Sequence, residues 1–115
     1  PPAALLSQMP EAGAISLVKR EFVLTPATEQ SLLALIDILR RATGARLSAS
    51  HVLRAMLIGV EHARPTIETE SRRIGPLKLP SNAHGRDAER ARFERRIAAV
   101  LIAGMRAAAS LDAES

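Results

Sequence analysis

The chain has 115 residues, of which 47% are hydrophobic and 24% charged, so one packed domain with at most an appended piece is expected, and wholesale disorder is not. It contains no cysteine, which excludes disulfides, thiol nucleophiles and cysteine zinc sites. The 16 arginine and lysine residues outnumber the 12 acidic ones and give a net charge of +4, which modestly favours a polyanionic partner.

The opening residues, 1–14, contain three prolines and little periodicity, which predicts a flexible N-terminal arm. This segment lacks the basic residues of a signal peptide. No apolar run in the chain reaches the roughly 18 residues of a membrane span. We therefore expect a cytoplasmic, nucleoid-associated bacterial protein with no membrane partner.

Residues 17–25, LVKREFVLT, alternate imperfectly between apolar and polar side chains and predict one short strand that Pro26 closes. The two faces of this strand carry different residues, namely Phe22 and Leu24 on one and Lys19, Glu21 and Val23 on the other. A lone strand leaves its backbone N–H and C=O groups unpaired. A second copy of the chain could supply the missing strand across a two-fold axis.

Two helices are expected next. The first begins at Pro26 after the N-cap Thr25, ends near Gly44, and buries one face, formed by Leu32, Leu35, Ile36 and Leu39. Ser48 or Ser50 caps the second helix, which ends before Pro65 and carries an apolar side formed by Val52, Leu53, Met56, Leu57 and Val60. Two such helices and a strand bury too little alone, which again predicts a dimer.

The second half of the chain is expected to be a linker at 65–82 followed by an amphipathic C-terminal helix at 83–115. The apolar stripe of that helix consists of Phe93, Ile97, Val100, Leu101 and Ala108. It would pack on the dimer, on its own symmetry mate or on another protein. Its arginines, Arg86, Arg90, Arg92, Arg95 and Arg96, alternate with acidic residues, which favours a solvated face of helix ion pairs over a second DNA-binding patch.

Residues 18–62 resemble the ribbon-helix-helix (MetJ/Arc-type) family of DNA-binding proteins. The resemblance rests on REFVLTP before the first helix and on GARLSASHVLRAML across the turn into the second. It implies a mainly α fold: a ribbon-helix-helix domain at 15–64, whose homodimer is joined by an intermolecular two-stranded antiparallel ribbon, followed by the linker and the C-terminal helix.

The resemblance also implies roles for individual residues. Base contacts in the major groove would come from Lys19, Glu21, Val23 and Thr25. Phosphate contacts at the start of the second helix would come from Ser48, Ala49 and Ser50, with Arg46 beside them. The dimer core would be Phe22, Leu24, Leu32, Leu35, Ile36, Val52, Leu53 and Met56.

Catalytic and metal sites are not expected. The three histidines, His51, His62 and His84, lack metal-site spacing and are expected at the surface. No serine has a nucleophile-elbow context, no glycine-rich phosphate loop occurs, and no cofactor is implied. We expect a sequence-preferring double-stranded DNA-binding protein, a bacterial transcriptional repressor of its own or a neighbouring operon. One alternative is an antitoxin, or a plasmid partition or conjugation accessory factor, whose C-terminal helix binds a protein partner. Another is a purely structural helical dimer with no DNA role, which Glu21 and the modest net charge favour.

Overall fold

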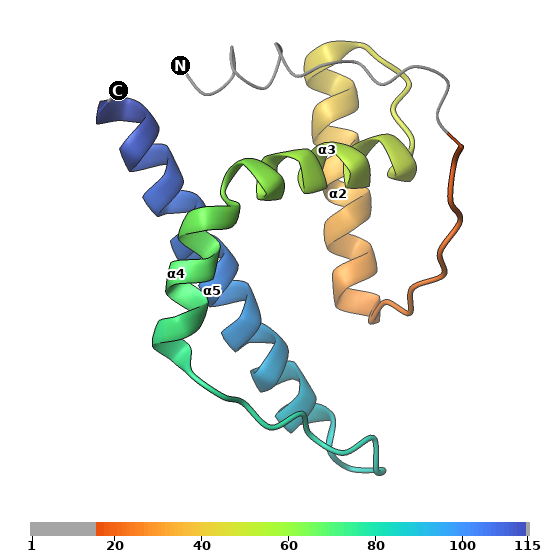
Figure 1. Cartoon of the computed structure of the whole chain (residues 1–115). Helices are drawn as coiled ribbons and strands as arrows, with labels where there is room; N and C mark the ends of the chain where they lie inside the picture. Colours follow the sequence, from red (N-terminus) through yellow and green to blue (C-terminus); the bar gives the residue numbers. More distant parts are fainter. Residues whose placement is uncertain (1–15, 115) are drawn as a thin grey trace. The chain divides into compact units, whose positions relative to one another are not determined.

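The computed structural model describes residues 16–114, and four helices, α2 to α5, account for the regular structure of that range (Figure 1). The predicted N-terminal arm, residues 1–14, lies outside the described residues. The chain divides into two compact units, one ending at Leu57 and the other running from Ile58 to the C-terminus. The mainly helical composition predicted from the sequence is confirmed.

The first helix, α2 (Pro26–Thr43), begins at the predicted cap. The Thr25 hydroxyl oxygen accepts a 3.2 Å hydrogen bond from the Thr28 amide, and the Thr28 hydroxyl oxygen accepts a 2.9 Å bond from the Thr25 amide. This reciprocal pair satisfies two amides that the helix itself leaves unpaired. Ile36 is the buried residue of α2, and the other predicted core residues of this helix are half-buried.

The helix ends at Gly44, whose φ of 71° lies in the left-handed region that glycine adopts without a steric cost. The Gly44 amide donates to the Arg40 carbonyl over 2.8 Å. After a short turn, α3 (Ala49–His62) begins, and Val52, only 2% exposed, is its buried residue. Helix, glycine turn and helix therefore follow one another as predicted.

The other unit is built around α4 (Arg64–Ile74) and α5 (Asp87–Glu114), which pack along each other (Figure 1). At their crossing the Thr66 hydroxyl donates a 2.6 Å hydrogen bond to the Gly104 carbonyl. Gly104 and Ala108 are the buried residues of α5. The absence of a side chain at Gly104 lets the backbone of α4 approach closely at Ile67.

The predicted strand at 17–25 is wrong, and so is the ribbon that it was to form. Residues 16–25 are non-helical, but no residue between 16 and 114 belongs to a strand or a β-bridge. A strand requires a second extended segment to exchange backbone hydrogen bonds with, and the described chain supplies none. The described fold is all-helical, which removes the structural basis for the ribbon-helix-helix resemblance.

The predicted linker at 65–82 is shorter than expected, because its first part is the helix α4. Pro65 led to the wrong boundary: it follows the end of α3, as expected, but it also occupies the first turn of α4. Proline is tolerated there since the amide that it lacks has no partner within the helix. Residues 75–86 form the actual connection to α5.

Candidate nucleic-acid interface

The N-terminus of α3 is capped by a serine and a histidine. The Ser48 amide donates a 3.0 Å hydrogen bond to Nδ1 of His51, and the His51 amide lies 3.4 Å from the Ser48 hydroxyl oxygen that accepts from it. The spacing is that of a capping box, in which a glutamate or glutamine normally occupies the third position. The imidazole replaces the glutamate without bringing a negative charge. No acidic residue lies in the first turn of α3, so nothing there repels an anion.

The turn in front of α3 is held by side-chain hydrogen bonds. Arg40 reaches from the last turn of α2 and donates from Nε to the Leu47 carbonyl over 2.7 Å. The Thr43 hydroxyl oxygen accepts a 3.2 Å bond from the Ala45 amide and donates to the Leu39 carbonyl over 2.7 Å. These bonds hold the chain between α2 and α3 in one conformation, so the start of α3 is presented on a fixed turn.

One face of α3 is free for contact with a partner. Val52 is buried, whereas Ser50 and Arg54 are exposed. Each of these two lies two residues from Val52, which is about 200° around the helix, and they are one turn apart. A hydroxyl and a guanidinium therefore lie on the same solvent-facing side, beside the helix N-terminus.

The sequence around this turn contains basic residues but no acidic ones. Residues 38–60 contain four arginines and no aspartate or glutamate. Arg41 pairs with Asp37 at 3.1 Å on the surface of α2, but Arg46 and Arg54 have no ion-pair partner among residues 16–114. The other unit differs, because acidic neighbours pair with many of its arginines, including Arg64, Arg72, Arg73, Arg86 and Arg90.

The predicted phosphate contacts lie together in this region. Arg46, Ala49 and Ser50 are exposed, and Ser48 is the cap itself. The predicted base contacts are divided: Lys19, Glu21 and Val23 are exposed, whereas the side chain of Thr25 is engaged in the cap of α2. Their contact with bases stays a prediction.

The predicted dimer-core residues differ in burial within the single chain. Ile36 and Val52 are buried, and Leu32 and Leu35 are half-buried. The remaining four are exposed, by 70% for Phe22, 49% for Leu24, 40% for Leu53 and 48% for Met56. An interface between two chains at these residues stays a prediction.

Two features of the site were missed in the sequence. Arg54 follows Ser50 by four residues, and this spacing alone places both on one helix face. His51 follows Ser48 at capping-box spacing, which a search limited to glutamate and glutamine overlooks. His62 is less exposed than expected: its side chain is 25% exposed, and its Nε2 lies 2.7 Å from an Asp112 carboxylate oxygen.

Within residues 16–114, no three histidine, aspartate or glutamate side chains cluster in a way that could hold a metal ion. None of the described helices is long and apolar enough to span a membrane.

Comparison with known proteins adds no relative. The sequence matches no protein-family model, and no curated protein or solved structure is similar to it. The ribbon-helix-helix resemblance thus has no support from a family match either, and the chain is not assigned to a family.

Proposed function

We propose that this protein binds double-stranded DNA through the basic turn, which we define as residues 40–54, and regulates transcription in a bacterial cytoplasm. The observation that carries the proposal is the acid-free run at 38–60, in which exposed arginines flank the N-terminus of a capped helix. Unpaired cations on a fixed turn suit a regularly spaced polyanion better than a neutral or cationic partner.

The proposed contacts divide into two kinds. Phosphates would be held by the amides of Ala49 and Ser50 at the start of α3, with Arg46 and Arg54 on either side. Backbone amides and arginine forks bind phosphate oxygens without regard to base sequence. Sequence preference would come from the exposed residues Lys19, Glu21 and Val23, of which Lys19 can donate to guanine O6 or N7.

We propose that the DNA-binding form is a homodimer. Phe22, Leu53 and Met56 are each 40% exposed or more, and Leu33, Ile38 and Leu57 are 54%, 60% and 58% exposed. So much apolar surface within one small unit is unfavourable in a monomer. A second copy would cover it, and a dimer would favour repeated or palindromic DNA sites.

Light scattering during size exclusion measures the mass of the protein directly. A monomer at the concentrations used for DNA binding contradicts the proposed homodimer.

The test is a titration of fluorescent duplex DNA at about 50 and 200 mM salt. One duplex comes from the region flanking the protein's own gene, and a second has a random sequence. We expect tighter binding to the flanking duplex, weakened steeply by salt. Arg46→Ala and Arg54→Ala should each weaken binding to both duplexes and reduce the slope of log K against log salt by about 0.9.

The matched control is Arg72→Ala, which removes the same charge from an arginine that already pairs with Glu68 at 2.9 Å. This variant should bind both duplexes nearly as tightly as the unaltered protein. If Arg72→Ala weakens binding as much as Arg46→Ala, only net charge matters and the proposed interface is wrong. Binding that does not change with salt also contradicts the proposal.

A further inference from the structure

A shallow groove follows one face of α5, in the unit that does not contain the basic turn. It consists of two hollows of about 340 and 310 Å³, and Arg96 lines both. The first lies between α5 and the connection at 75–86, with Lys78, Arg92 and Phe93 on its walls. The second lies between α5 and the end of α4, with Ala99 and Ala103 on the α5 side. We call these two hollows the α5 groove.

Residues of α5 line this groove at helical spacing, from Glu89 through Arg92, Phe93, Arg96, Ala99 and Val100 to Ala103. At 1.5 Å per residue this stripe is about 21 Å long, or roughly four helical turns. Its two ends differ in chemistry. The first hollow has Phe93, Arg92 and Lys78 on its walls, Arg96 lies where the two hollows meet, and the second hollow has Ala99, Val100 and Ala103 on its α5 side.

The charge of the groove is unbalanced. Lys78, Arg92 and Arg96 have no ion-pair partner among residues 16–114. The two acidic residues of the lining are already engaged: Glu89 accepts from Arg86 at 2.8 Å, and Glu70 accepts from Arg73 at 3.0 Å. The cations therefore remain available to an acidic partner. Arg92 and Arg96 are one helical turn apart, which matches carboxylates one turn apart on a facing helix.

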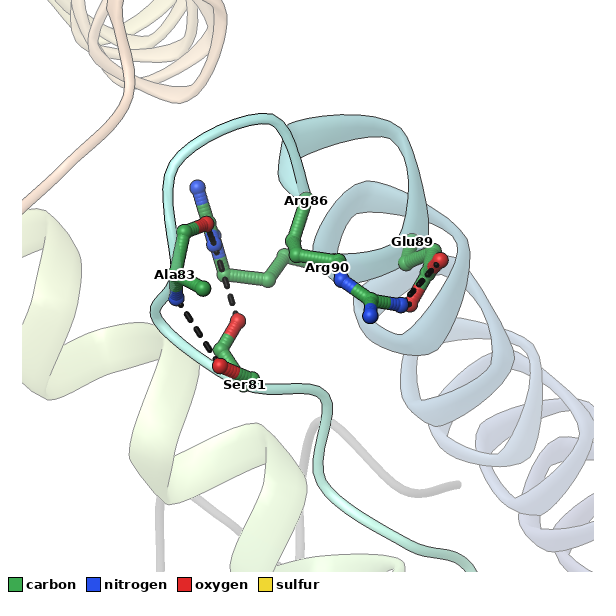
Figure 2. A network of polar contacts seen from close by, with 5 residues as sticks. All are labelled: Ser81, Ala83, Arg86, Glu89 and Arg90. Carbon is green, nitrogen blue, oxygen red and sulfur yellow. Dashed lines mark hydrogen bonds and ion pairs between the residues drawn. The ribbon is translucent and has the colours of Figure 1, made fainter.

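The C-terminal part of the connection is hydrogen-bonded to α5. Arg90, on the first turn of α5, donates from Nη1 to the Ser81 carbonyl over 3.0 Å and to the Ala83 carbonyl over 3.3 Å (Figure 2). The Ser81 hydroxyl oxygen in turn accepts a 2.9 Å bond from the Ala83 amide. These bonds tie the connection to α5 immediately after Pro80, the last residue of the connection that lines the first hollow.

We propose that the α5 groove binds an acidic amphipathic helix of another protein. Alanines at 99 and 103 allow a second helix to approach closely, and Phe93 and Val100 offer apolar surface to its side chains. Lys78, Arg92 and Arg96 pair with its carboxylates. Duplex DNA fits less well, because it presents phosphates to the cations but no apolar side chains to Phe93 and Val100. This proposal does not depend on DNA binding, since it concerns the other unit.

The probe is a fluorescein-labelled helical peptide of roughly 15 residues, with leucine on one face and glutamate flanking it. Fluorescence anisotropy measures its binding to the full-length protein. We expect micromolar affinity, lowered about tenfold or more by Arg96→Glu. Arg95→Glu is the matched control, since Arg95 neighbours Arg96 on α5 but lines neither hollow. It should change the affinity less than about twofold at physiological salt.

A charge-reversal variant distinguishes loss of the groove from loss of the fold, because a misfolded protein would bind neither peptide. The double variant Arg92→Glu/Arg96→Glu should lose the glutamate peptide and bind the same peptide with lysine in place of glutamate. No binding by the unaltered protein overturns the proposal, as does an equal loss in Arg95→Glu and Arg96→Glu. Equal binding of a peptide whose leucines are replaced by serine also overturns it. If Arg96→Glu weakens duplex binding and the peptide does not bind, the groove serves nucleic acid and the proposal is wrong.

Discussion

The Thr66 hydroxyl donates to the carbonyl of Gly104 over 2.6 Å, directly beside the point where Ile67 covers the same glycine. A β-carbon added at Gly104 would lie 2.6 Å from the Ile67 α-carbon and 2.8 Å from its backbone nitrogen. Both are main-chain atoms, so relief requires that α4 and α5 move apart. The helix pair that forms the α5 groove therefore depends on the absence of a side chain at one position.

Gly104→Ala should destabilise the protein. The gain in helix propensity, up to about 1 kcal/mol, is outweighed by overpacking, which typically costs about 1–3 kcal/mol and also strains the Thr66 hydrogen bond. Chemical denaturation followed by circular dichroism measures the change. Gly59→Ala is the matched control, because nothing lies within 4 Å of a β-carbon at Gly59. That variant should be more stable by roughly 0.5–1 kcal/mol. A stabilised Gly104→Ala variant contradicts the close packing of α4 on α5.

Thr25→Ala should lower stability by about 1 kcal/mol, because it removes the acceptor for the Thr28 amide at the start of α2. Thermal unfolding is the measurement. Ser31→Ala serves as the control: Ser31 lies within the same helix and donates only to the Ala27 carbonyl. Alanine has the higher helix propensity there, so this change should be neutral or slightly stabilising. Equal losses in the two variants would mean that the cap contributes nothing.

His62 and Asp112 should show energetic coupling of about 1 kcal/mol in a double-mutant cycle. Their side chains are only 25% and 19% exposed, so solvent screens the pair weakly. The two residues are 50 positions apart, and the pair therefore connects the end of α3 to the end of α5. The variants are His62→Ala, Asp112→Ala and the double variant, measured by urea unfolding.

The exposed pair Arg64 and Glu61 provides the comparison cycle, with side chains 70% and 52% exposed at 2.7 Å. Solvent and salt screen such a pair, and its coupling should not exceed about 0.5 kcal/mol. If the two cycles give equal coupling, burial of the His62–Asp112 pair adds nothing to its strength.

Arg90→Lys should loosen the connection to α5 although it keeps the positive charge. The planar guanidinium reaches two carbonyls and also pairs with Asp87, whereas an ammonium group cannot reproduce this fork. Hydrogen exchange read by mass spectrometry should show faster exchange in residues 79–86. Arg95→Lys, on the same helix, should leave it unchanged. Unaltered exchange in Arg90→Lys would show that the loop is held by other contacts.

The sequence predicts local structure well where one interaction decides it. Thr25 and Pro26 start α2, Gly44 ends it, and each assignment depends on a cap or a backbone angle formed within a few residues. The predicted strand failed for the opposite reason. Alternating side chains indicate which backbone is able to pair, but pairing requires a second segment, and no local pattern identifies it.

The same distinction holds for the candidate interface. Ser48 and Arg46 are recognisable from their position before a helix, and the acid-free run is visible in the letters alone. The hydrogen bond from Arg40 to the Leu47 carbonyl cannot be recognised in the sequence, because it depends on how the chain turns between two helices. The α5 groove could not be predicted, since one of its walls comes from α4, a helix that lies within the predicted linker, and the other from the connection at 75–86.

The acid-free run at 38–60 also has a kinetic consequence. Its four arginines account for the whole formal charge of +4, because the rest of the chain carries twelve basic and twelve acidic side chains. Outside one short segment the protein is electroneutral. A polyanion approaching from a distance would therefore be attracted mainly toward that segment. Electrostatic attraction of this kind acts on the association rate more than on the lifetime of the complex. Removal of these arginines should therefore lower the association rate constant more than it raises the dissociation rate constant.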